Sequence, residues 1–143
     1  MKVITDGIKM TGRVEVKIAG VSTVFPNMVV SAGRNFIAST LAGNTGSPMS
    51  HMAVGLGSGE VSPLELSLQD ETARVALDNS ISQDNIVIFT AVFPQGVGSG
   101  VLSEAGIFNS SGAGEMLCRT RFPSNVIKGS TEAVSITWSV TVG

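Results

Sequence analysis

The end of the chain, Val134-Ser-Ile-Thr-Trp-Ser-Val-Thr-Val142, decides the fold class. Every second residue of this stretch is apolar, and every residue between them carries a hydroxyl group. Because successive side chains of a β-strand point to opposite faces, this period of two predicts a strand with one buried face. Such one-sided strands are usual in antiparallel sheets. The hydroxyl face is left for solvent or for a neighbouring subunit.

Similar segments recur along the rest of the chain. Ala19-Gly20 is a turn signal between two of them, and residues 109–114 have the composition of a hairpin loop between two others. Residues 85–93 are apolar on both faces, which is typical of a central strand, and Pro94 ends this segment. The predicted strands lie at residues 13–18, 21–25, 85–93, 101–108, 116–122 and 134–142, with a weaker candidate at 49–54.

One helix is predicted over residues 31–42. Ser31 is the N-cap candidate, and Gly43 fits the C-terminal stop. The apolar stripe expected to face the core consists of Phe36, Ile37 and Leu41. For residues 64–77 the pattern leaves two alternatives open, a short turn of helix or an extended arm.

These elements predict a mainly β fold, a single antiparallel β-sandwich or barrel-like domain with one short helix. A chain of 143 residues without a linker or an internal repeat fits one domain, so residues 1–143 are interpreted as a single β domain. Residues 1–26 are an N-terminal arm, an edge hairpin or part of that domain. Residues 43–62 are rich in Gly, Ser and Pro, which predicts a flexible segment.

The composition argues against several classes of function. Nine Lys and Arg and 11 Asp and Glu are scattered along the chain, so no basic patch for nucleic acid is visible. No apolar run approaches the ~20 residues that cross a bilayer, and the first ten residues lack the apolar core of a secretory signal. Charged residues make up 14% of the chain, against ~25% in typical soluble domains, which favours a surface that contacts other protein.

Catalytic candidates are few. His51 is the only histidine, so a Ser-His-Asp site would have to use it, with Asp70, Asp78 or Asp84 as the orienting acid. No Gly-x-Ser-x-Gly elbow surrounds a serine. The favoured interpretation of His51 is a histidine that is hydrogen-bonded within a strand.

The run Gly55-Leu-Gly-Ser-Gly59 is similar to part of a phosphate-binding loop. It lacks the Gly-Lys-Ser/Thr ending of such loops and the full spacing of the dinucleotide fingerprint. Glu60 would repel an anion, and Pro63 discourages a long helix at this point. A connecting segment is therefore favoured over a nucleotide site.

Glu104 lies in the apolar context VLSEAGIF, so its carboxylate needs a partner if it is buried. Arg119 and Arg121, on the strand across the predicted hairpin, are the basic candidates. A structural ion pair is favoured over a catalytic acid, because no second carboxylate or histidine is near in sequence. Cys118, the only cysteine, excludes a disulfide within one chain and is interpreted as a small core residue. The sequence therefore predicts no enzyme and no catalytic, cofactor-binding or metal-ligating residue.

The second half of the chain carries an ordered set of motifs: SGVLSEAGIFN at 99–109, GEMLCRTRFP at 114–123, IKG at 127–129 and VSITW at 134–138. This set resembles small virion proteins of tailed bacteriophages. In that family a TEAGLF strand, a Gly-rich tip, a MLART-F strand and a closing ITW strand follow one another. Ser103 and Ile107 are conservative departures from the pattern. Upstream segments agree, including 66–77 with Glu71 and Arg74, so the resemblance covers roughly residues 27–142.

The resemblance implies a virion component, assembled in the host cytoplasm, that packs in multiple copies with itself and with other phage structural proteins. A neck, collar or tail subunit is favoured; a head-decoration (cement) protein and a receptor- or carbohydrate-binding fibre module are the alternatives. Sugar-binding sites usually expose aromatic rings, whereas this chain has six Phe, no Tyr and one Trp, Trp138, on the apolar face of its strand. No nucleic acid, membrane, small-molecule substrate or cofactor is expected.

Overall fold

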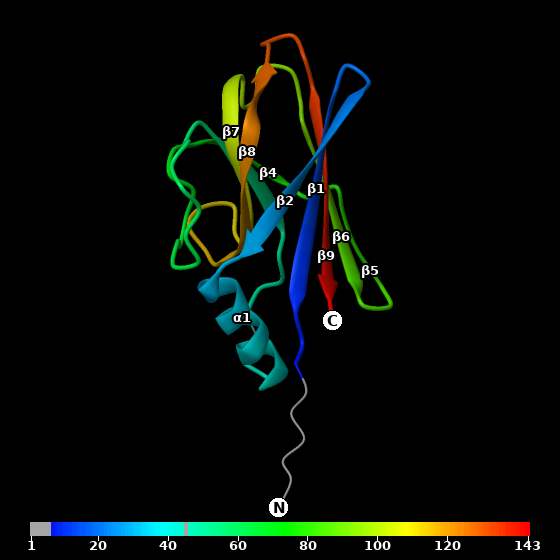
Figure 1. The fold of residues 1–143 in the computed structure, drawn as a ribbon, viewed down its shortest axis with the longest axis vertical. Helices are drawn as coiled ribbons and strands as arrows, with labels where there is room; N and C mark the ends of the chain where they lie inside the picture. The colour runs from blue at the N-terminus through cyan, green and yellow to red at the C-terminus, as the bar shows by residue number, and fades with distance from the viewer. Residues whose placement is uncertain (1–6, 45) are drawn as a thin grey trace, which may run out of the picture.

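The computed structural model describes residues 7–44 and 46–143, without the side chain of Asn125. This part of the chain forms nine β-strands and one helix, which confirms the mainly β prediction (Figure 1). All strand pairs are antiparallel, and the sheet curls into a half-barrel. The elements are β1 Met10–Ile18, β2 Val21–Val29, α1 Ser31–Leu41, β3 His51–Gly55, β4 Glu71–Ala76, β5 Asn79–Gln83, β6 Ile86–Phe93, β7 Gly100–Phe108, β8 Met116–Lys128 and β9 Val134–Val142.

The strands are ordered β4-β3-β7-β8-β2-β1-β9-β6-β5, so the two edge strands of the sheet are consecutive in sequence. Leu77 and Asp78 join them. The Leu77 N–H donates to the carbonyl of Ser50 beside β3 at 2.9 Å, and the Asp78 N–H donates to that of Thr90 on β6 at 2.8 Å. One run of chain therefore connects the two edges of the curled sheet. Strand β2 pairs with two strands. It pairs with β1 along most of its length and with β8 at its last two residues.

Strand β9 lies between β1 and β6 with its apolar face in the core. Its hydroxyl residues are half-buried, which confirms the predicted alternation. Trp138 is fully buried, with Val14 and Phe89 as its strand partners, and it is the largest fully buried side chain of the described part. The buried residues of β9 are Val134, Ile136, Trp138 and Val140.

Both predicted hairpins form. Ala19 and Gly20 connect β1 to β2 with φ values of 49° and 80°, and two successive positive φ angles are typical of a type I′ turn. Strands β7 and β8 pair on either side of the 109–114 tip. Strand β8 continues to Lys128, beyond the predicted end at residue 122.

Helix α1 forms where the sequence predicts it, but its N-terminal cap differs. Val30 holds the N-cap position without a side-chain cap, so the assignment of Ser31 as N-cap is wrong. Ser31 is the first helical residue, and its backbone N–H donates to the carbonyl of Pro63 in a distant loop at 2.7 Å. At the C-terminus Gly43 has a φ of 83° and its N–H bonds back to the last turn, as in a Schellman motif, which confirms the predicted stop.

The predicted apolar stripe of α1 is only partly correct. Phe36 and Ile37 pack against the core, whereas Leu41 is 84% exposed. A side-chain carbon at Gly33 would overlap the carbonyl of Leu117, so the first turn of the helix lies directly on β8. Leu41, in the last turn, is remote from this contact.

Several other boundaries differ from the sequence expectations. Residues 10–26 form a hairpin inside the strand order, between β8 and β9, rather than at an edge, and residues 1–6 lie outside the described part. The segment 43–62 contains strand β3, which lies between β4 and β7 in the sheet. Residues 64–77 form a loop followed by β4. Strand β6 is second from an edge, and Val92 is 45% exposed, so it is not buried on both faces.

Candidate functional site

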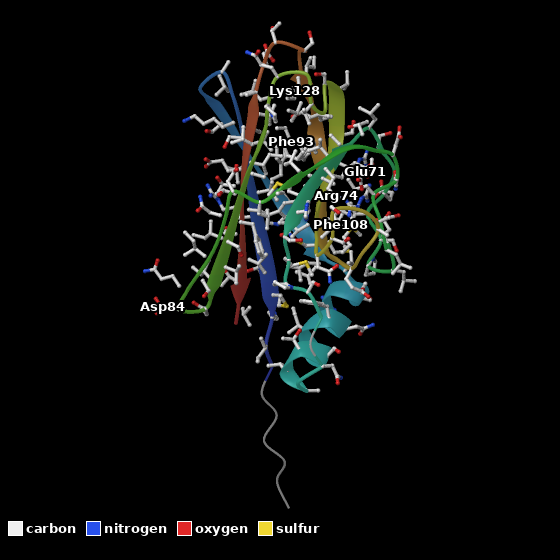
Figure 2. All side chains as sticks on the ribbon, turned by 180° about the vertical axis from the view of Figure 1, so that it is seen from behind. Glu71, Arg74, Asp84, Phe93, Phe108 and Lys128 are labelled. Carbon is white, nitrogen blue, oxygen red and sulfur yellow. The ribbon has the colours of Figure 1, made fainter. Side chains whose placement is uncertain are left out.

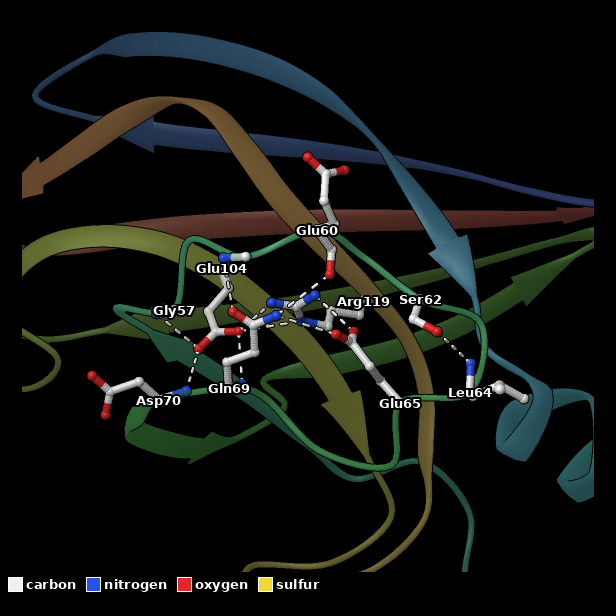
Figure 3. A network of polar contacts seen from close by, with 10 residues as sticks. Gly57, Glu60, Ser62, Leu64, Glu65, Gln69, Asp70, Glu104 and Arg119 are labelled. Atoms are coloured by element: carbon white, nitrogen blue, oxygen red, sulfur yellow. Dashed lines mark hydrogen bonds and ion pairs between the residues drawn. The ribbon is translucent and has the colours of Figure 1, made fainter.

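A fully buried carboxylate organises one side of the molecule (Figure 3). Glu104, on β7, accepts five hydrogen bonds. Its Oε1 accepts the backbone N–H of Gly57 at 3.0 Å and of Asp70 at 2.7 Å. Its Oε2 accepts the N–H of Gln69 at 3.0 Å and two bonds from the Arg119 guanidinium, at 3.2 and 2.6 Å. Bonds to an ionised group are stronger than neutral ones, and they offset the cost of burying the charge.

Of the two basic candidates, Arg119 is the one that pairs with Glu104. Its guanidinium is fully buried and bridges Glu104 to Glu65, whose Oε2 lies 2.7 Å from Nη1. Arg121 lies directly opposite Glu104 in the register of β7 and β8, whereas Arg119 lies opposite Gly106, two residues further along β7. Arg121 is partly exposed and lies 3.4 Å from the exposed carboxylate of Glu60. The buried pair is therefore the diagonal one.

The glycine-rich run at 55–59 surrounds this internal anion. Gly57 donates its N–H to Glu104, and Gly59 donates its N–H to Oε1 of Gln69 at 2.8 Å. A side-chain carbon at Gly57 would lie 2.8 Å from Cδ of Glu104, closer than such contacts allow. Glycine is needed here because the backbone passes directly over the carboxylate. The Gly57 amide, of the kind a phosphate-binding loop offers to a ligand, is occupied by the protein's own side chain.

These contacts fasten residues 56–70, the β3–β4 loop, to the sheet. Besides the bonds to Glu104, the Gln69 side chain donates to Oε1 of Glu65 at 3.3 Å. The carbonyl of Pro63 binds the first turn of α1. Leu68 is buried beneath the loop, whereas Leu64 and Leu66 are 77% and 70% exposed. The arrangement thus holds two apolar side chains at the surface on a loop that is anchored at both ends.

A second clamp holds the 109–114 tip of the β7–β8 hairpin. Arg74, on β4, stacks over the ring of Phe108 at 3.8 Å and forms two bonds with the carboxylate of Glu71, at 3.0 and 2.7 Å (Figure 2). Its Nη1 also donates to the carbonyls of Ser110 and Ala113, at 3.0 and 2.8 Å. Glu71 and Arg74 are part of the sequence resemblance, and the structure gives them this positional role.

The catalytic candidates lie in different parts of the fold. His51 begins β3, and its Nδ1 is 2.8 Å from Oγ of Ser50. Asp70 adjoins the Glu104 clamp, Asp78 joins β4 to β5, and Asp84 lies in the turn after β5 with a φ of 51°. Within residues 7–44 and 46–143, no hydrogen bond or ion pair links any of these acids to His51.

Cys118 and Trp138 are core residues. Both are fully buried, and burial raises the pKa of the Cys118 thiol far above its ordinary value. Among the residues described, no group of three or more His, Cys, Asp or Glu side chains is placed to hold a metal ion. No helix in the described part is long and apolar enough to span a membrane.

Sequence reasoning identified Glu104 and its two candidate partners but missed the contributions of Glu65, Gln69 and Gly57. The signal that could have found Gly57 is the combination of a buried acid on one strand with closely spaced glycines in a neighbouring loop. Glu65 and Gln69 carry no such signal, because exposed loops commonly contain both residue types.

The chain matches the family model described as phage tail-collar fibre protein, N-terminal, over residues 21–135. No curated protein and no solved structure matches the chain. The matched region runs from β2 to the start of β9 and includes both clamps. This finding confirms the resemblance to tailed-phage virion proteins. Because the match covers most of the chain, the protein belongs to the family of the phage tail-collar fibre protein N-terminal domain and is a structural protein of the phage tail.

Proposed function

We propose that the chain is a neck or collar subunit, or a subunit of the adjoining tail, that assembles in multiple copies in the host cytoplasm. The family match over residues 21–135 supports the proposal, since the family is described as phage tail-collar fibre protein. The partners in this proposal are further copies of the chain and other phage structural proteins. The proposed role is non-enzymatic and involves no nucleic acid, membrane, cofactor or small-molecule substrate.

The two clamps support a role in assembly. Each holds a surface segment in one conformation, the β3–β4 loop through Glu104 and the hairpin tip through Arg74. A segment that is already ordered loses less conformational entropy when it binds a partner than a flexible one does. The clamps therefore suit a protein that contacts neighbours through its loops.

The aromatic residues favour this role over a carbohydrate-binding module. Trp138 and five of the six Phe are buried, and the sixth, Phe36, is half-buried. A sugar ring that stacks on protein needs an exposed aromatic face, and none of these residues is exposed. The family description likewise favours the tail over a head-decoration role.

Immunogold labelling of intact parent virions, with an antibody against this chain, tests the location. We expect label at the head–tail junction or on the tail. Label spread over the head would replace the proposal with a decoration role, and absence of label from intact and gently disrupted particles would refute both. Antibody absorbed with the purified chain is the matched control.

A genetic test addresses the function itself. Deletion of the coding sequence, complemented by the wild-type chain in trans, should leave the host with incomplete tails or unjoined heads and tails only when complementation is omitted. Complete particles in the absence of the chain would contradict a structural role.

A further inference from the structure

An apolar groove lies between α1 and the ends of β1 and β9. Helix α1 and the C-terminus lie toward the same end of the molecule (Figure 1). It consists of two adjoining hollows of about 380 and 770 Å³, which share Met10, Ile37 and Val142 in their walls. The inner hollow reaches Phe36 in α1, and the outer one is bordered by Leu41. Hollows of this size and lining can accept several apolar side chains.

The rim of the groove is apolar and basic. Ile8 and Leu41 are 75% and 84% exposed, which is unusual for large aliphatic residues that lie together. Lys9 and Arg34 are the charged residues in the walls of the outer hollow. Neither forms an ion pair with a carboxylate of the described residues. The groove therefore suits a partner segment that combines apolar side chains with acidic ones.

The β3–β4 loop has these complementary properties. Leu64 and Leu66 are 77% and 70% exposed, and the loop, residues 56–70, contains three acidic residues and no Lys or Arg. One of these acids, Glu65, is engaged by Arg119. Of the others, Asp70 is exposed, and the side chain of Glu60 is 96% exposed with only a long contact to an arginine at 3.4 Å.

The loop and the groove contact different parts of α1. The loop binds the N-terminal end of the helix through Pro63, whereas the groove follows Ile37 and Leu41 toward the C-terminal end. None of the groove-lining residues belongs to the loop. Because Glu65 is also held by Arg119, the loop of one copy stays away from the groove of the same copy.

We infer that the β3–β4 loop of one copy docks in the α1 groove of a second copy, with Leu64 and Leu66 in the hollows and the free acids beside Lys9 and Arg34. The inference rests on the proposed multi-copy assembly and supplies a contact for it. Because the two surfaces are different, the contact is heterologous, and its repetition gives a closed ring or an open filament.

Sedimentation velocity of the purified chain, from micromolar to millimolar concentration, tests the contact. The wild type should associate as concentration rises, and the variant with Leu64→Ser and Leu66→Ser should associate about 100-fold more weakly, because two buried leucines are lost. Val21→Ser is the control, because Val21 is an exposed apolar residue outside both the loop and the groove, and this variant should associate like the wild type. Circular dichroism melts establish that all variants are folded.

Mixing the variants identifies the geometry. A groove variant with Ile8→Ser and Leu41→Ser retains an intact loop, and the loop variant retains an intact groove. At a concentration at which the wild type associates, each variant alone should be monomeric. The mixture should give a 1:1 heterodimer that grows no further. A wild type that stays monomeric at millimolar concentration, a loop variant that associates like the wild type, or a mixture that stays monomeric would overturn the inference. Label at the collar in the virion test would leave the proposed function standing in each case.

Discussion

The substitution Glu104→Gln probes the buried clamp with almost no change of shape. The carboxylate has two acceptor oxygens, which together accept three backbone N–H groups and two N–H groups of Arg119. Glutamine keeps one oxygen and replaces the other with an NH₂ group. Whichever way the amide is oriented, its NH₂ group faces N–H donors. Arg119 then remains buried, with Glu65 as its only carboxylate partner among the described residues.

The expected loss of folding stability in this variant is large. Removal of one partner from a buried ion pair costs about 3–5 kcal/mol, because the remaining charge is left buried and incompletely paired. Glu65 retains part of the compensation for Arg119, so we expect a value near the lower end, about 3 kcal/mol. For a chain of this size, that corresponds to a fall in Tm of roughly 10 °C.

Urea titration and calorimetry of the wild type and the variant measure this difference. Hydrogen exchange should also show faster exchange at the amides of Gly57, Gln69 and Asp70 than global unfolding alone explains, since these donors lose their acceptor. Glu60→Gln is the matched control, because its pair with Arg121 is exposed and should contribute less than about 0.5 kcal/mol. A loss below about 1 kcal/mol for Glu104→Gln would refute the view that this carboxylate holds the loop.

Four further outcomes are expected. Gly57→Ala should destabilise the protein by about 1–3 kcal/mol in urea titration, because the added carbon meets Glu104; an unchanged midpoint would show that the loop can shift freely. Trp138→Ala should lower the free energy of unfolding by about 3–5 kcal/mol in the same titration. Trp138→Phe should lower it clearly less, because the indole N–H has no partner in the described structure and its loss leaves no group unpaired. Cys118 should react with a thiol reagent at pH 8 only after unfolding, because burial raises its pKa and excludes the reagent; rapid reaction of the folded protein would contradict this. His51→Ala should fold and enter particles like the wild type, and loss of a hydrolytic activity in that variant would revise the non-enzymatic proposal.

The strands were predictable from sequence where one face is apolar throughout. The alternation at Val134–Val142 and the glycine-rich tip between β7 and β8 both reflect local chemistry, and both appear in the structure. Strand β3 was harder to define because Gly55 and the small residues around it resemble a loop. Its pairing with β4 and β7 depends on strands that are 16 or more residues away in sequence.

The cap of α1 and the β3–β4 loop depend on contacts between distant segments. Ser31 has the residue type of an N-cap, but Val30 holds that position, and the Ser31 N–H donates to the carbonyl of Pro63, more than 30 residues away in sequence. Glu104 could be recognised as a buried acid with a basic partner, whereas its three backbone donors come from a loop 34 to 47 residues away. No local pattern indicates which amides a buried carboxylate accepts.

The composition of the clamp suggests what it contributes to the protein. A buried ion pair gives little net stability compared with apolar residues of the same volume, so stability alone is a weak reason for a sheet to contain Glu104 and Arg119. Three of the five hydrogen bonds to Glu104 come from the backbone of the β3–β4 loop, and Arg119 holds the same loop through Glu65. An apolar pair could fill the space but could not bind those amides. The charges are therefore best explained by the position they impose on the loop, and Leu64 and Leu66, which that loop exposes, are the side chains whose placement depends on them.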